Sequence, residues 1–382
     1  MADAKNLSES HPLLRSYMPE LDSIRGIAIL ATLWYHLLFW ARDLSLYPRW
    51  QARILAIASL GQFGVHLFFV LSGFLITGIL LDSRERRDYY LRFYQHRAVR
   101  ILPAYYLTLA AITAFGVTST GFLVMSLFYC SNLSPLFGIA LSYPVLWSLA
   151  VEEHFYLIWP TVVRFLSIST LLKVLLLLFC ISPIIRLFSY FHAVKTNTFY
   201  SGFGYFTWNN LDGLALGGIL ALLLRYKDFT RRHARWLAFI LFLGAAVVTL
   251  AGFRYGIFTR MTAVGTACQI VPFNLSFGGL LLTFLLLGSA NSSRLVSPLF
   301  LTFFGRISYG LYLYHLLVIS GYDAIEKRTH WAVRVGFGLW GQVWVRFVLV
   351  SLAAVFVSYL SRRYFEEPLL KLKDRPIRLW RA

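Results

Sequence analysis

The sequence predicts an all-α integral membrane protein, a bundle of about ten transmembrane helices with both termini on the cytoplasmic side. Of the 382 residues, 58% are hydrophobic and only 14% are charged, and the mean hydropathy is +0.64. Soluble domains are about half apolar and a quarter charged. Apolar runs of roughly 20 residues, the length that crosses a bilayer, recur from residue 22 to residue 365. The chain is therefore expected to lie within a lipid bilayer.

The apolar runs divide the chain into three parts. Residues 1–21 form a short cytoplasmic tail without the features of a cleaved signal, residues 22–365 form one membrane domain, and residues 366–382 form a basic cytoplasmic tail. The charge-free stretch 117–144 contains glycine and proline, so part of it is expected to be a short re-entrant or interfacial piece. The predicted spans are 22–41, 60–81, 98–116, 145–166, 171–190, 209–225, 236–253, 271–289, 307–322 and 344–362.

The distribution of Lys and Arg predicts the orientation. Loops rich in these residues face the cytoplasm. With the N-terminus inside, the dense basic clusters at 84–100, 225–235 and 362–381 all fall on the cytoplasmic side. The opposite side receives only scattered basic residues such as Arg49 and Arg254. This pattern, with a pI of about 10.0, favours a multi-pass protein of a bacterial inner membrane.

Charge and cysteine content argue against two other classes of protein. The net charge of +19 sits in short clusters between apolar segments, whereas a nucleic-acid-binding protein carries a basic face on a soluble module. Cys130, Cys180 and Cys268 are scattered singly. Because they lack the spacing of metal ligands, no metal site is expected.

Titratable side chains inside the spans are the first indication of a functional site. Such a residue costs about 2.5–3.5 kcal/mol on insertion scales, so it faces a cavity or a partner. His36 follows Arg25 by eleven positions in the first span, which places it roughly 16 Å deeper. Glu152 and Glu153 lie at a comparable depth in the fourth span. We therefore expect a His–carboxylate pair, in which the carboxylate orients His36 as a general base.

Two alternatives bear on this pair. Neighbours on a helix are rotated by about 100°, so only one glutamate is expected to face the cavity, and the WSL-x-x-E spacing favours Glu152. His36 has an alternative interpretation as a structural histidine hydrogen-bonded between helices. The residues alone leave both interpretations open.

The third span begins with two arginines on one helical face. Arg97 and Arg100 are three positions apart at the cytoplasmic surface. Arginine presents a planar fork that suits phosphate oxygens, so this pair, with Arg25 from the same side, predicts a clamp for the phosphates of coenzyme A. The alternative is that both arginines only anchor the helix at the cytoplasmic interface.

Other polar residues form a second set of candidates. Ser308, Tyr312 and His315 are spaced by four and three residues, which gives a polar stripe on one helical face. His315 is the second candidate for a catalytic or acceptor-binding histidine, with packing as the alternative. The glycines of the second span, including Gly73, allow close helix approach. Glu366 and Glu367 beside Arg362 and Arg363 predict a cytoplasmic ion-pair latch, and Asp212 lies at the start of the sixth span.

Seven fragments, taken in this order, resemble the acyltransferase-3 family of membrane acyltransferases, which includes O-antigen and exopolysaccharide O-acetyltransferases and antibiotic acyltransferases. Each fragment alone is a weak signal, but the resemblance covers essentially the whole chain. The fragments are LDSIRGIAILATLWYH, FGVHLFFVLSGFLITG, HRAVRILPAYY, LWSLAVEEHFYL, LDGLALGG, GRISYGLYLYH and YFEEP.

The resemblance implies a ten-helix bundle that binds acyl-coenzyme A at the cytoplasmic face. It maps the functional core onto His36, Arg97 and Arg100. Further motif members are Arg25, Trp147, Ser148 and Glu152. Some family members add a C-terminal hydrolase-like periplasmic domain, which is not expected here because the sequence stops soon after YFEEP.

The expected function is therefore a membrane O-acyltransferase. It would move an acyl group, most simply acetyl, from acetyl-CoA or another acyl-CoA to a hydroxyl of a sugar-containing acceptor such as a cell-surface polysaccharide, lipid-linked glycan or glycosylated small molecule. Ser72, Ser148 and Ser308 are candidates for a covalent acyl-enzyme, but helix serines usually bond between helices, so direct transfer is the simpler expectation. The alternative is a transporter of a lipid-linked sugar or other solute, since intramembrane His, Glu and Arg also build proton relays.

Overall fold

The computed structural model describes residues 11–40, 42–196, 203–255, 258, 262–290 and 293–371. Every regular element within these ranges is helical, and each predicted span overlaps one long helix. The long helices are α1 (Pro19–Trp34), α3 (Gly64–Asp82), α4 (Tyr89–Ala114), α6 (Leu146–Phe165), α7 (Ile168–Thr196), α8 (Leu211–Leu223), α9 (Arg231–Tyr255), α11 (Val271–Gly288), α13 (Leu299–Thr329) and α15 (Leu339–Leu360). The shorter helices are α2 (Arg49–Ala58), α5 (Thr120–Leu127), α10 (Ala263–Cys268), α12 (Ser293–Val296), α14 (Trp331–Arg334) and α16 (Glu367–Leu370).

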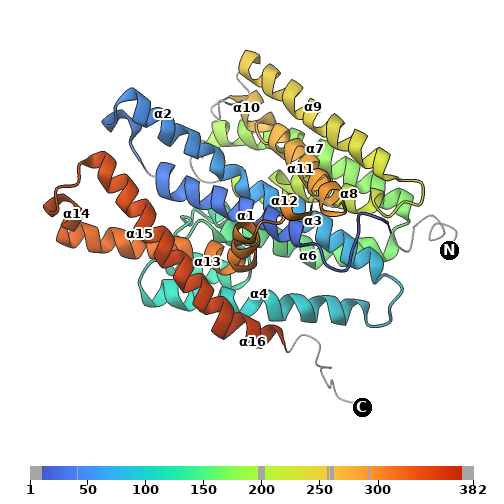
Figure 1. Cartoon of the computed structure of the whole chain (residues 1–382), viewed down its shortest axis with the longest axis horizontal. Coiled ribbons are helices and arrows are strands. Elements are labelled where there is room, and N and C mark those ends of the chain that lie inside the picture. Colours follow the sequence, from blue (N-terminus) through green and yellow to red (C-terminus); the bar gives the residue numbers. More distant parts are fainter. Residues whose placement is uncertain are drawn as a thin grey trace.

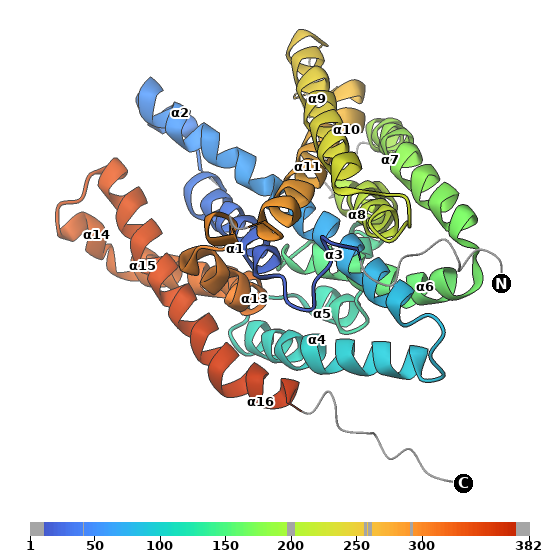
Figure 2. The ribbon, with the colours of Figure 1, turned by 45° about the vertical axis from the view of Figure 1, so that its right-hand side comes forward.

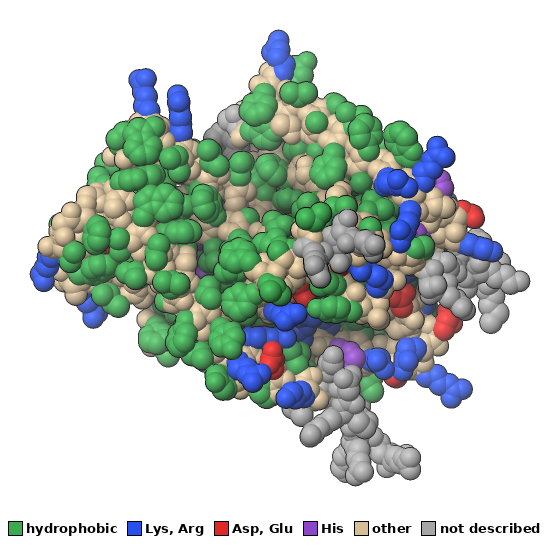
Figure 3. All heavy atoms as spheres, viewed as in Figure 1, with side chains coloured by type: hydrophobic (Ala, Val, Ile, Leu, Met, Phe, Trp, Pro, Cys, Tyr) green, Lys and Arg blue, Asp and Glu red, His purple; other side chains and the backbone are tan. Residues whose placement is uncertain are grey.

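The surface of the bundle is apolar. Phe253 is 78% exposed and Leu250 is 70% exposed, which is unfavourable in water but suits contact with lipid tails. Figure 3 shows hydrophobic side chains over the middle of the visible face, with Lys and Arg mostly towards its ends. The chain is thus a multi-pass membrane protein. Within the residues that the structure describes, five helical stretches are long and apolar enough to cross a membrane: Arg49–Asp82, Ile168–Thr196, Arg231–Tyr255, Ala263–Gly288 and Leu339–Leu370.

Helix α1 lies near the middle of the molecule, between α13 and α3 (Figures 1 and 2). On its far side α3 packs closely against α8. Most of α3 is buried by its neighbours, whereas most of α7, α9 and α15 faces outward. Thr32 on α1, Thr77 on α3, and Ser308 and His315 on α13 are buried, so polar groups of these helices are enclosed by protein, which is where a site within a membrane has to lie.

Glycine allows the close packing of α3 on α8, as the sequence predicts. A Cβ atom on Gly73 would lie 1.9 Å from the carbonyl oxygen of Leu214, and one on Gly217 would lie 2.0 Å from that of Val70. No side chain fits at either position unless the helices move apart. These two contacts fix the distance between α3, which carries Ser72, and α8.

The stretch 117–144 contains short helices only. Helix α5 has its N-terminus capped by Ser119, whose hydroxyl accepts a hydrogen bond from the Phe122 amide. A 3₁₀ segment, Ser131–Phe137, follows and ends at Gly138 with φ +68°. Neither element is long enough to cross a bilayer, so the prediction of a short piece here is confirmed.

The predicted C-terminal latch is also present. Arg362 lies 3.7 Å from a Glu366 oxygen and 3.5 Å from a Glu367 oxygen, and Arg363 lies 3.6 Å from Glu367. This part of the chain is a π-helical turn, Ser361–Glu366. The remainder of the predicted basic tail, from residue 372, lies outside the described residues.

The glycine contacts lead to a test of the α3–α8 packing. We expect Gly73→Ala to destabilise the protein by about 1–3 kcal/mol, because the added methyl group forces the two helices apart. Thermal unfolding of the detergent-solubilised protein, followed by near-UV circular dichroism, measures the effect. Gly321→Ala on α13 is the matched control, since nothing lies within 4 Å of its added Cβ. Equal melting of the two variants would contradict the packing argument.

Candidate functional site

Two tyrosines set the position of α4 against α6. Pro160 removes one backbone donor from the interior of α6. The hydroxyl of Tyr94 donates to the Leu157 carbonyl and that of Tyr89 donates to the Pro160 carbonyl, both at 2.9 Å. These bonds hold the first part of α4, which leads to Arg97, beside the second half of α6. Both glutamates of the fourth span lie in the first half of α6.

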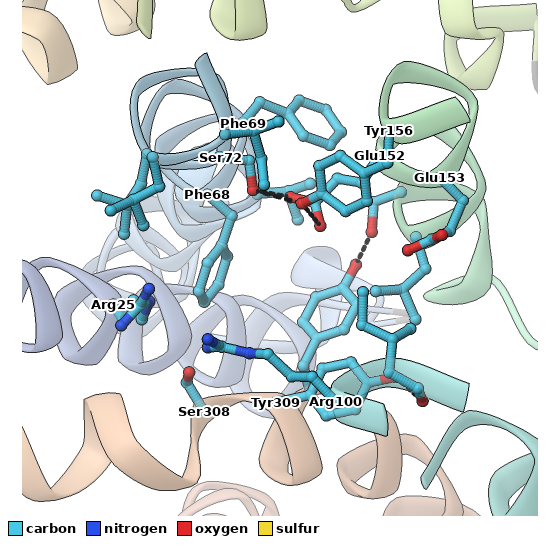
Figure 4. Close-up of a pocket in the computed structure, with 18 of the residues that line it drawn as sticks. Arg25, Phe68, Phe69, Ser72, Arg100, Glu152, Glu153, Tyr156, Ser308 and Tyr309 are labelled. Atoms are coloured by element: carbon cyan, nitrogen blue, oxygen red, sulfur yellow. Dashed lines mark hydrogen bonds between the residues drawn. The ribbon is translucent and has the colours of Figure 1, made fainter. Parts of the chain in front are cut away.

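The three predicted arginines converge on one cavity of about 110 Å³, which we call the arginine cavity. Arg25 comes from α1, and Arg97 and Arg100 come from α4. Figure 4 shows Arg25 and Arg100 pointing into the same space, with Ser308 beside them. Arg25 is paired with Asp22 at 2.6 Å. Among the described residues, Arg97 and Arg100 form no ion pair and no hydrogen bond, although the Arg97 guanidinium lies 5.0 Å from the centroid of the Tyr156 ring.

The carboxylates line the arginine cavity. Glu152 accepts a hydrogen bond from the Ser72 hydroxyl at 2.6 Å and from the Tyr156 hydroxyl at 3.1 Å (Figure 4). Glu153 lines the same cavity, so the expectation that only one of the two glutamates faces it is wrong. The reason is that both glutamates lie within electrostatic range of Arg97 on α4, and Glu152 also contacts Ser72 on α3.

His36 lies in a π-helical turn that the sequence did not predict. After α1 the chain continues as the π-helix Tyr35–Phe39, closed by a bond of 2.9 Å from the Trp40 amide to the Tyr35 carbonyl. Such turns are frequent at functional sites. The expected contact of His36 with Glu152 is not formed: the His36 Nδ1 atom lies 3.0 Å from the Thr32 carbonyl oxygen and 3.3 Å from Nε2 of His315. The second candidate histidine therefore takes the place predicted for the carboxylate.

These contacts determine the tautomers of both histidines. A carbonyl oxygen only accepts, so His315 Nδ1, at 3.0 Å from the Leu311 carbonyl, carries a proton and its Nε2 is an acceptor. His36 Nδ1 must then carry the proton that it shares between Thr32 and His315. The lone pair of His36 is left on Nε2, which makes no hydrogen bond within the described part of the chain. A base needs this arrangement to accept a proton from a hydroxyl.

A second cavity, of about 880 Å³, is lined by His36, and we call it the histidine cavity. It is formed by the last turn of α1 and by the beginnings of α3 and α6, which meet at one end of the bundle. Trp147 lines it and stacks on Tyr205, with ring centroids 4.9 Å apart.

Tyr312 joins the two cavities, because it lines both of them. Its hydroxyl lies 2.6 Å from Ser148 Oγ, and Ser148 lines the arginine cavity. The Ser148–Tyr312 hydrogen bond thus lies in the wall between the cavities.

The candidate serines are all hydrogen-bonded. Ser72 bonds to Glu152, Ser148 bonds to Tyr312, and Ser308 donates to the Gly305 carbonyl of its own helix at 2.8 Å. None of them hydrogen-bonds to a histidine in the described structure.

One member of the site was missed from the sequence. Arg186 on α7 is 3% exposed and pairs at 2.9 Å with Asp212, which is 1% exposed. Arg186 also donates to the carbonyls of Asn209 and Ala267 and lines the histidine cavity. The signal was a lone arginine within an apolar span, since such a residue requires a partner. Asp212 was noted, but no partner for it was predicted.

A comparison with protein families shows to which family the chain belongs. The family model described as an acyltransferase domain matches residues 18–363. The chain belongs to the acyltransferase-3 family. No solved structure matches it.

The chain is also similar to two curated O-acetyltransferases. It is 26% identical to the peptidoglycan O-acetyltransferase OatA of Listeria monocytogenes, over 96% of this chain and 59% of that protein. It is also 26% identical to the O-acetyltransferase OatA of Staphylococcus aureus, over 93% of this chain and 57% of that protein. The chain thus spans less than two thirds of the length of either relative.

The buried ion pair leads to a second test. We expect Asp212→Asn to destabilise the protein by about 3–5 kcal/mol, because the Arg186 charge stays buried without its counter-ion. Unfolding in mixed micelles with increasing dodecyl sulfate measures the change. Asp323→Asn is the matched control: Asp323 pairs with Arg346 but is 49% exposed, so its loss should cost about 0–1 kcal/mol. The argument fails if both variants unfold at the same detergent fraction.

Proposed function

We propose that the chain is a membrane O-acetyltransferase that moves an acetyl group from cytoplasmic acetyl-CoA to a hydroxyl of a cell-surface glycan. The observation that carries the proposal is the junction of the two cavities. Arg97 and Arg100 line the arginine cavity, where they are available to bind an anion. Tyr312 lines this cavity and also the histidine cavity, which His36 lines. The family assignment supports acyl transfer over the transporter alternative, and the names of the relatives support acetyl transfer to a glycan.

The proposed topology has ten spans, with both termini at the cytoplasmic face of a bacterial inner membrane. The basic clusters near 84–100, 225–235 and 362–381 support this orientation. It places Arg25, Arg97 and Arg100 towards the cytoplasm, where coenzyme A is found, and the histidine cavity towards the opposite side.

The lining of the arginine cavity suggests how the donor binds. Arg97, Arg100 and Tyr312 all line this cavity of about 110 Å³. We propose that the phosphates stay at the arginines while the thioester extends towards Tyr312.

The proposed reaction is direct attack of the acceptor on the thioester. The hydroxyl oxygen bonds to the carbonyl carbon as its proton passes to Nε2 of His36. The carbon–sulfur bond then breaks, and the sulfur leaves with the electron pair and takes up the proton released by His36 Nε2, which gives the coenzyme A thiol and returns His36 to its neutral form. His315 and the Thr32 carbonyl are positioning groups, because they keep the His36 lone pair on Nε2.

The role of His36 is tested by His36→Ala. We expect transfer of radiolabel from acetyl-CoA to glycan, in membranes with equal expression, to fall by about 10²–10⁴-fold, the usual worth of a general base. His233→Ala, at an exposed histidine of α9, is the control and should label normally. Undiminished labelling by His36→Ala would remove His36 from the mechanism. If the wild type labels no glycan while solute flux depends on it, the transporter alternative is favoured.

The role of the arginines is tested with two donors. We expect Arg97→Ala with Arg100→Ala to raise the KM for acetyl-CoA by at least about tenfold, since hydrogen bonds to charged groups contribute about 1.5–3 kcal/mol. With S-acetylpantetheine, which has no phosphates, the KM should match that of the wild type. Arg92→Ala, at an exposed arginine of α4, controls for the loss of surface charge. An equal rise in KM for both donors would show that the arginines do not recognise phosphate.

A further inference from the structure

We infer that the histidine cavity is the acceptor site and that it binds an uncharged pyranose ring of the glycan, held by the side-chain amides of Gln62 and Gln269. This inference rests on the proposed function, which names a glycan acceptor but assigns it no site.

The charges of the two cavities differ. Arg25, Arg97, Arg100, Glu152 and Glu153 line the arginine cavity. Of the residues that line the histidine cavity in the described structure, only Arg186 is a Lys, Arg, Asp or Glu, and Asp212 neutralises it. The histidine cavity therefore offers little attraction to a polyphosphate and suits a ligand without net charge.

Two side-chain amides on the wall of the histidine cavity are available for hydrogen bonds to a ligand. Gln62, in the 3₁₀ segment Ser59–Phe63, and Gln269, at the end of α10, are half-buried on its wall. Neither amide has a hydrogen-bond partner among the residues that the structure describes. A ligand site places a few polar groups where they fix the ligand's orientation, and sugar hydroxyls, which both donate and accept, suit both the oxygen and the nitrogen of a side-chain amide.

Aromatic side chains complete the cavity. Trp147 and Tyr205 stack with their planes 24° apart, and the Trp40 ring lies 5.5 Å from that of His36. Flat aromatic surface next to hydrogen-bonding side chains matches a pyranose, which has apolar ring faces and polar edges. The volume of about 880 Å³ falls in the range of ligand pockets, about 300–1,000 Å³. A lipid chain would leave the amides unbonded.

The position of His36 links binding to transfer. His36 Nε2 carries the available lone pair, and His36 lines the same cavity as both glutamines. A pyranose bound to these amides would therefore have hydroxyl groups within the cavity that contains the base. Gln62 and Gln269 act in recognition and not in chemistry, so their loss should affect acceptor binding without any donor present.

The test is equilibrium dialysis of radiolabelled N-acetylglucosamine tetramer against the full chain in lipid nanodiscs, which leave both membrane faces accessible. No acyl donor is added. Gln62→Leu and Gln269→Leu keep the side-chain size but remove the amide. Gln51→Leu is the matched control, since Gln51 on α2 lines neither cavity. Each variant must elute as a single peak at the wild-type volume, which shows that it is folded.

We expect the wild type and Gln51→Leu to bind the tetramer alike, and each cavity variant to bind about tenfold more weakly. Equal binding by all four proteins, or no binding by the wild type, would overturn the inference. The proposed function is judged separately, by acetyl transfer. Glutamine-dependent binding without any acetyl transfer would support the sugar site and overturn the enzymatic proposal.

Discussion

Inside a bilayer no water is available to satisfy polar groups, so each one must find a partner in the protein or face a cavity. This constraint separates structural from functional residues here. Arg15 is paired with Glu20, and Arg186 is paired with Asp212. Arg97 and Arg100 have no such pairing in the described structure and face a cavity instead. Polar groups without a partner therefore identify a binding site better than charge alone does.

The constraint also explains how a histidine is held without a carboxylate. In a soluble enzyme a buried aspartate often orients the ring. Here the Thr32 carbonyl and the neutral His315 ring do so, which avoids placing another charge beside His36. The π-helical turn contributes to this arrangement, because it changes the direction of the side chains that follow α1. His36 thereby lines the histidine cavity instead of meeting Glu152 on α6.

The positions of the helices and the shared helical face of the arginines could be predicted from the sequence, because both follow from local rules. Apolar runs locate helices, and the spacing of Arg97 and Arg100 puts them on one face. Predictions from the sequence failed for contacts between side chains that depend on how helices rotate against each other. Depth alone suggested that His36 meets Glu152, but α13 places His315 nearer. The partner of Asp212 and the cavity that contains Gln62 and Gln269 arise from segments far apart in the chain, so no spacing could reveal them.

The shared wall at Tyr312 suggests why one bundle holds two cavities of such different character. A single polar pocket would not bind both a polyanionic donor and an uncharged acceptor well, since the charges that attract the donor would be left unpaired around the acceptor. Separate cavities allow each to be recognised by its own chemistry. In the proposed reaction the two cavities need to meet only where the acetyl group would lie, and this group is small and uncharged. Tyr312 and Val65 line both cavities, and the Ser148–Tyr312 hydrogen bond fixes the Tyr312 side chain at that boundary.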